Sequence, residues 1–158
     1  MKVEYINSFI SSLDHTFRTM LECEVERGQA ALKENFSPKY EVSGVIGLSG
    51  KAVGTVVVSL SKEGAMQAAS HMLMSENTEI NDDVVDAVGE LTNMVAGAAK
   101  SQLAEYQLMV SLPNVITGLE HEVRFPSNVR PICVPFTTKW GPLALEVGFS
   151  PDKAPVLV

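Results

Sequence analysis

Cysteines, aromatic residues, basic clusters and long apolar runs are all scarce in this sequence of 158 residues. Its two cysteines, Cys23 and Cys133, are too few and too far apart for a disulfide framework or a cysteine-rich metal site. No apolar run approaches the ~20 residues that span a bilayer, and Glu4 and Asn7 interrupt the stretch where a signal peptide would be apolar. We therefore expect a cytoplasmic protein with reduced thiols and no membrane association.

Positive charge is also limited. Twelve Lys and Arg residues stand against nineteen Asp and Glu residues, a formal net charge of −7 with no basic run. Binding to a phosphate backbone needs a basic footprint, so nucleic acid is excluded as the main partner. The three histidines, His15, His71 and His121, lie on separate predicted elements without ligand spacing, and we expect no metal site.

The apolar periodicity predicts an α+β fold. A helix is expected over about residues 3–22, a β-hairpin over 40–60, a second helix after Ser61, and a third helix from Asn81 to about Glu105. Four strand-like runs follow, at 107–113, 114–120, 130–138 and 143–149. Grouped rather than alternating elements favour a largely antiparallel sheet with helices packed on one face. We expect a single domain over 1–158.

The third helix carries two faces of different character. Three- and four-residue steps give a buried stripe of Val84, Val88, Leu91, Val95 and Ala98. A second stripe, nearly opposite, consists of Asp86, Glu90, Asn93, Gly97 and Lys100. Glycine inside a helix costs about 1 kcal/mol against alanine. The small residues beside the Glu90–Asn93 pair are Gly89, Ala96 and Gly97, an arrangement that would let another molecule approach closely. A merely solvated polar surface is the alternative from periodicity alone.

The residue pattern on this helix resembles a known signature. Asp86-x-x-x-Glu90-x-x-Asn93, with Pro113 following 20 residues after Asn93, is similar to the motif of the CheC/CheX/FliY family of bacterial chemotaxis phosphatases. Residues 89–97 and 112–118 resemble the family's motif helix and the strand segment after it, and the similarity extends over most of the chain. CheC-type members carry two such helices, whereas this chain has one and is closer to the CheX branch. The resemblance implies a CheC-like fold and a homodimer joined through sheet edges.

The same resemblance implies a reaction: hydrolysis of the aspartyl phosphate on a CheY-like receiver domain. A carboxamide can hold a water through both a donor and an acceptor, so Asn93 is expected to orient the attacking water. Glu90 would pair with the active-site lysine of the receiver, and Asp86 would extend the contact. Gly89 and Gly97 would provide clearance for the partner. The receiver would supply Mg²⁺, and this chain would need no metal or cofactor of its own.

Other functions remain compatible with the sequence. The main alternative is a non-catalytic receiver-binding or dimerisation module of the same fold, and a flagellar switch component is a further one. The sequence names neither the receiver nor the pathway, which could be chemotaxis or another two-component circuit. Phosphate loss from a phosphorylated receiver separates the enzyme from the binding module.

Overall fold

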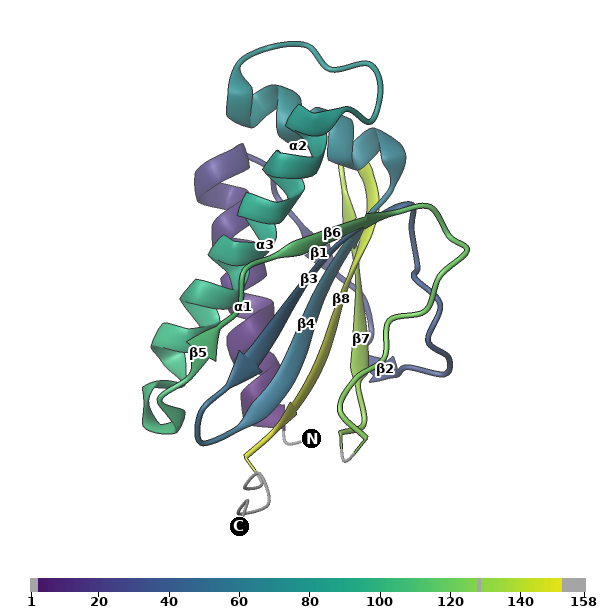
Figure 1. Cartoon of the computed structure of the whole chain (residues 1–158). Helices are drawn as coiled ribbons and strands as arrows, with labels where there is room; N and C mark the ends of the chain where they lie inside the picture. Colours follow the sequence, from purple (N-terminus) through teal and green to yellow (C-terminus); the bar gives the residue numbers. More distant parts are fainter. Residues whose placement is uncertain (1–2, 128, 152–158) are drawn as a thin grey trace.

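An antiparallel sheet with helices on one face forms the body of the chain (Figure 1). This computed structural model describes residues 3–127 and 129–151. In chain order, the described elements are α1 (Val3–Leu21), β1 (Glu26–Arg27), β2 (Ala31–Leu32), β3 (Val42–Ser49), β4 (Val53–Leu60), α2 (Lys62–Leu73), α3 (Asp82–Gln102), a 3-10 turn (Ala104–Tyr106), β5 (Met109–Val110), β6 (Asn114–Thr117), β7 (Ile132–Thr138) and β8 (Gly141–Ser150). The predicted α+β class is confirmed. The predicted domain also includes residues 1–2, 128 and 152–158, which lie outside the described residues.

All strand pairs among the described residues are antiparallel. The sheet runs in the order β1-β7-β8-β4-β3-β5, and β2 also pairs with β7 while β6 pairs with β3. The predicted hairpin is β3–β4, with Val45 opposite Val57. The other edge of β3 carries β5 at Leu48 and Ser49, and β6 along residues 42–45. Strands β1 and β2 were not predicted, since a two-residue strand shows no alternating pattern.

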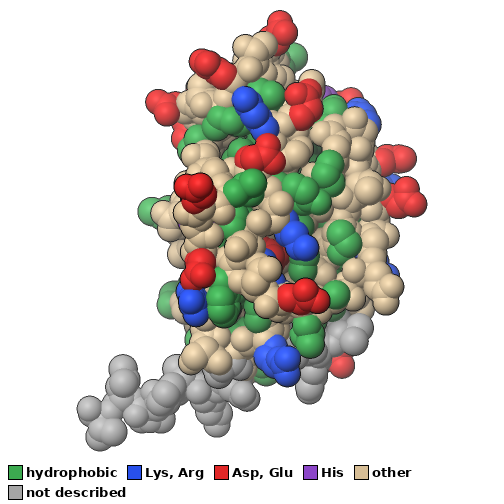
Figure 2. All heavy atoms as spheres, turned by 90° about the vertical axis from the view of Figure 1, so that its right-hand side faces the viewer, with side chains coloured by type: hydrophobic (Ala, Val, Ile, Leu, Met, Phe, Trp, Pro, Cys, Tyr) green, Lys and Arg blue, Asp and Glu red, His purple; other side chains and the backbone are tan. Residues whose placement is uncertain are grey.

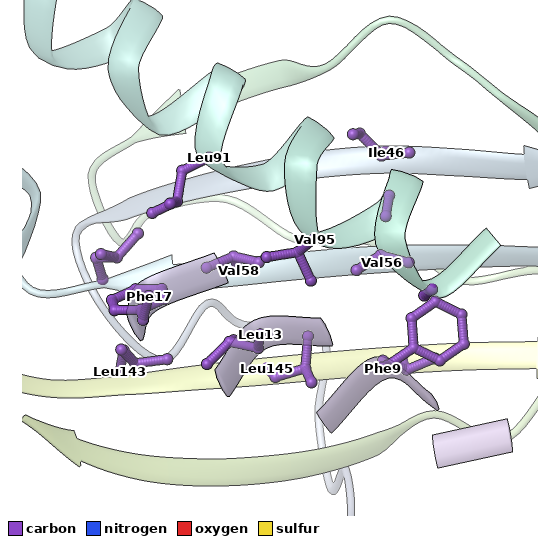
Figure 3. Close-up of a cluster of buried hydrophobic side chains, with 14 of the residues drawn as sticks. Phe9, Leu13, Phe17, Ile46, Val56, Val58, Leu91, Val95, Leu143 and Leu145 are labelled. Carbon is purple, nitrogen blue, oxygen red and sulfur yellow. The ribbon is translucent and has the colours of Figure 1, made fainter. Parts of the chain in front are cut away.

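The three helices lie on the same face of the sheet and enclose the main core (Figure 1). Alternate residues of β4, including Val56 and Val58, point toward them and are fully buried. Phe9, Leu13 and Phe17 project from one side of α1 into the same cluster (Figure 3). Removing this apolar area from water holds α1 and α3 against the sheet.

The opposite face of the sheet is covered by irregular segments. Val57 of β4 packs there with Val123 and Phe125. Glu146 of β8 lies opposite Val57 in the register and forms an ion pair with Lys33, their side chains being 1% and 3% exposed. Figure 2 shows the side of the molecule to the right of Figure 1, where Lys and Arg side chains are scattered among acidic and apolar ones.

The helix that carries the motif begins where the sequence predicted. Asn81 accepts a hydrogen bond from the Val84 N–H at 2.9 Å, which caps one of the free donors at the start of α3. The helix ends at Gln102 rather than near Glu105, because residues 104–106 tighten into the 3-10 turn. The expected boundary is therefore corrected by about one helical turn.

Both cysteines are unpaired, as the sequence indicated. Cys23 and Cys133 are buried, and burial raises the pKa of each thiol above its usual value. A raised pKa keeps a thiol protonated and unreactive near neutral pH. Across residues 3–127 and 129–151, we find no helix with the length and apolar character needed to span a membrane.

Candidate functional site

One side of α3 presents the polar motif to solvent. The exposed residues on this side include Asp86, Glu90, Asn93 and Lys100. The buried residues that the spacing predicted are Val84, Val88, Leu91 and Val95. Ala98, which the spacing also assigned to the buried stripe, is only half-buried. Ala99 is fully buried instead, because Ala99 lies closer than Ala98 to Val88 and Val95 around the helix. The carboxylate of Glu90 and the carboxamide of Asn93 therefore stand one turn apart on an accessible surface.

Thr92 fixes how α3 lies on the sheet. Its side chain is fully buried, and its Oγ1 donates to the Val88 carbonyl at 2.7 Å. It packs against Gly44 of β3, where an added Cβ would overlap the Thr92 side chain. Asn93 lies about 100° further around the helix than Thr92. Because Thr92 packs against β3, the side chain of Asn93 points away from the sheet.

Gly89 lies under β6 rather than on the exposed face. A Cβ at this position would be 3.4 Å from Cγ2 of Val115 and 3.6 Å from Cγ of Pro113. The clearance that we expected Gly89 to give a partner is thus corrected, since this buried residue faces the chain's own strand, where a Cβ would make ordinary van der Waals contacts. The spacing could not reveal this, because β6 reaches α3 only through its pairing with β3.

Gly97 differs from Gly89 in its surroundings. It is half-buried, and a Cβ added there would have no neighbour within 4 Å. The backbone of α3 is therefore open to approach at Gly97, one turn after Asn93. This is the geometry that close approach of another molecule requires.

Leu112 is a surface residue beside this face that was not among the predicted site residues. It lies between β5 and β6, both of which contact α3, and is 87% exposed. The available signal was an apolar residue placed directly before Pro113. Without the fold, that pattern reads equally well as the end of a buried strand.

The exposed face offers two kinds of chemistry. Asn93 can donate and accept hydrogen bonds at once, which is what positioning a neutral water requires. The Glu90 and Asp86 carboxylates can pair with cationic side chains of another molecule. Within the described ranges, we find no cluster of three or more His, Cys, Asp or Glu side chains that could hold a metal ion. The side chains on this face can therefore form hydrogen bonds and ion pairs with a molecule that reaches it.

Comparison with known proteins assigns the chain to a family. The family model described as chemotaxis phosphatase CheX matches residues 42–137. The CheY-P phosphatase CheX of Thermotoga maritima is 27% identical in an alignment of 127 residues, which covers 78% of this chain and 82% of that protein.

Solved structures agree with this match. The chemotaxis protein CheX of Desulfovibrio desulfuricans is 30% identical and superposes with a TM-score of 0.85, covering 94% of this chain and 100% of that one. A chain of the CheX–CheY–BeF3–Mg²⁺ complex from Borrelia burgdorferi has the same fold, with 22% identity, a TM-score of 0.79, and coverage of 94% of this chain and 99% of that one. Since the family model spans more than half of the sequence, including all of α3, the chain belongs to the CheX family of chemotaxis phosphatases.

Proposed function

We propose that this protein hydrolyses the aspartyl phosphate of a phosphorylated CheY-like receiver domain. The family match and the name of the Thermotoga maritima relative support the reaction class. The proposal names Glu90 and Asn93 because both side chains are exposed on the same side of α3. A receiver surface can reach both side chains at once.

In this proposal, Asn93 enters the receiver's active site and orients the attacking water. Its carbonyl oxygen accepts a hydrogen bond from the water and its amide group donates one, which fixes a lone pair of the water toward phosphorus without removing a proton. The bond between the water oxygen and phosphorus forms as the bond from phosphorus to the aspartyl oxygen breaks, leaving phosphate and a free carboxylate on the receiver. The receiver supplies Mg²⁺ and a lysine that neutralise charge on the phosphoryl oxygens.

The other motif residues set register and affinity. Glu90 pairs with the receiver's lysine, a charge-assisted contact that holds Asn93 at the correct depth. Asp86, one turn earlier on the same side, extends this polar contact at its margin. Gly97 gives the receiver backbone room beside α3, which is supported by the open space around it.

Further features belong to the same proposal. The chain acts in chemotaxis or a related two-component pathway in the cytoplasm, as a homodimer, and carries no metal of its own. The homodimer is checked by sedimentation equilibrium of the purified protein, where a monomeric mass would contradict it. Metal independence is checked by treating this chain with a chelator, removing the chelator, and assaying it with the Mg²⁺-loaded receiver.

The central experiment measures phosphate release from a CheY-type receiver of the same genome, phosphorylated with acetyl phosphate. Asn93→Ala is expected to lower kcat by about 10²-fold or more, because the reacting water loses its orientation. The Kd for the receiver with beryllofluoride bound, a non-hydrolysable mimic of the phosphoryl group, should stay near the wild-type value.

The matched control is Asn7→Ala, which removes an exposed asparagine from α1. This variant should keep wild-type kcat and KM. Full activity of Asn93→Ala would refute the catalytic assignment.

The alternative is a non-catalytic receiver-binding or dimerisation module. It predicts that the wild-type protein binds the beryllofluoride-loaded receiver, or only itself, without accelerating phosphate loss. The same assay therefore separates the two functions.

A further inference from the structure

Leu112 combines strong exposure with a fixed backbone. Its side chain is 87% exposed, whereas most large apolar side chains that the structure describes are buried. It lies at the middle of the connector between β5 and β6, residues 111–113, which runs along the side of α3 (Figure 1). A single exposed leucine needs no explanation by itself, so the way this one is held is the informative feature.

Hydrogen bonds hold the connector on its Ser111 side. The Ser111 N–H donates to the Gly47 carbonyl at 2.9 Å, and the Gly47 N–H donates to Ser111 Oγ at 2.9 Å. Ser111 Oγ also lies 3.0 Å from the Leu112 carbonyl, to which it donates. The backbone immediately before Leu112 is thereby tied to β3.

Packing holds the connector on its other side. The Pro113 ring lies against Gly89 of α3, close enough that a Cβ at Gly89 would touch it. The ring also fixes the φ angle of Pro113 and restricts the backbone of Leu112 before it. The backbone that presents Leu112 to solvent is therefore already ordered in the free protein. Binding a partner there costs less conformational entropy, which favours affinity.

The position of the connector ties Leu112 to the motif. Gly89, which Pro113 covers, directly precedes Glu90 and lies about 40° around the helix from Asn93. A molecule that reaches Asn93 from solvent therefore meets the connector beside it. The exposed side of α3 is polar, and interfaces of this kind gain most of their affinity from a few desolvated anchors.

We propose that Leu112 is the apolar anchor of the receiver-binding surface. It enters an apolar recess on the phosphorylated receiver next to the aspartyl-phosphate pocket, while Glu90 and Asn93 enter the pocket itself. This inference rests on the proposed function and adds a binding residue outside the motif helix. Burial of a leucine side chain is worth about one to two orders of magnitude in affinity.

The test compares Leu112→Ala with Leu119→Ala. Leu119 is also exposed, at 52%, but it follows the end of β6 that leads away from α3 (Figure 1). For each variant we would measure kcat and KM for phosphate release from the acetyl-phosphate-treated receiver, and Kd for the beryllofluoride-loaded receiver. Leu112→Ala is expected to raise KM and Kd about tenfold or more with kcat near the wild-type value. Leu119→Ala should change none of them, and Leu112→Met, which keeps the apolar volume, should restore most of the affinity.

Three outcomes would overturn the inference. If the wild-type protein is active and Leu112→Ala leaves KM and Kd unchanged, the anchor is wrong and the proposed function stands. If Leu112→Ala changes the sedimentation mass, Leu112 belongs to a contact between two copies of this chain. If the wild-type protein neither binds the receiver nor releases phosphate, both the anchor and the proposed function are wrong.

Discussion

At the scale of single residues, the absence of a side chain at Gly97 matters as much as the polar groups around it. Glycine within a helix gives up stability that alanine would provide. At Gly97 the structure offers no internal reason for that loss, because the space around an added Cβ is open. At Gly89, by contrast, an added Cβ would make ordinary contacts with Val115 and Pro113, so that position is enclosed within the fold. We therefore interpret the open space at Gly97 as room for the receiver contact proposed above.

This interpretation predicts opposite effects of Gly97→Ala on stability and on function. The free energy of unfolding, measured by urea denaturation, should rise by about 0.5–1 kcal/mol, since alanine favours the helix. The kcat/KM for phosphate release should fall about tenfold or more, because the methyl group displaces the receiver from Asn93. A variant that is more stable and fully active would show that the receiver does not approach this part of α3.

At the scale of secondary-structure elements, the contact between α3 and β3 determines where the motif points. Thr92 fits over Gly44, and any side chain at Gly44 would have to push α3 away from the sheet. Thr92 is also buried and bonded to its own helix, so it cannot move aside easily. The outward direction of Glu90 and Asn93 thus depends on a residue of another element that carries no functional group.

Gly44→Ala should therefore destabilise the protein by about 1–3 kcal/mol, as overpacking of a filled core does. Adding Thr92→Ala should recover part of that loss, because it removes the overlaps with Oγ1 and Cγ2 and leaves the close contact with the Thr92 Cβ at 2.8 Å. A double-mutant cycle measured by urea denaturation is expected to give a coupling energy of about 0.5–3 kcal/mol. Additive effects of the two changes would show that the residues do not constrain each other.

At the scale of the whole molecule, the sheet separates α3 from a buried charge pair. Lys33 and Glu146 lie on the face away from α3, and the Lys33 ammonium group also donates to the Ser37 carbonyl at 2.9 Å. Burial raises the pKa of the Glu146 carboxyl above its usual value, against the opposing effect of Lys33 and Lys39. Such a pair fastens the segment before β3 onto the sheet without adding much net stability.

Lys33→Met should destabilise the protein by about 3–5 kcal/mol near pH 7.5, because it leaves Glu146 buried without its partner. A carboxyl group whose pKa is raised by folding contributes stability below its unfolded pKa and loses it as the pH rises through the folded-state pKa. Without Lys33 the folded-state pKa of Glu146 should rise further. The loss should accordingly be smaller near pH 4.5 than near pH 7.5 when the free energy of unfolding is measured at both values.

The double variant Lys33→Met/Glu146→Leu is the control for that experiment. Replacing a buried ion pair by apolar residues of similar volume is often neutral or stabilising, so most of the stability near pH 7.5 should return. A loss from Lys33→Met that does not depend on pH would argue against ionised Glu146 as its cause. Phosphatase activity of the double variant should match the wild type, since the pair lies on the other face of the sheet from α3.

The local pattern of the chain was sufficient to predict α3 and its two faces. Hydrogen bonds four residues apart fix the period of a helix, so the exposure of Asp86, Glu90 and Asn93 follows from spacing alone. The cap at Asn81 and the β3–β4 hairpin are likewise set by neighbouring residues. For the same reason, the α+β class could be predicted from the order of the elements.

The tertiary structure decided what lies beside that helix. The burial of Gly89 and the exposure of Leu112 depend on β5 and β6 pairing with β3, and the Lys33–Glu146 pair joins residues separated by 113 positions. Contacts of this kind are selected by packing of the whole chain, which a local hydrophobic period does not encode. The sequence by itself therefore determined the polar motif and the division of its helix into two faces, and the fold determined how that helix lies on the sheet and which surface surrounds it.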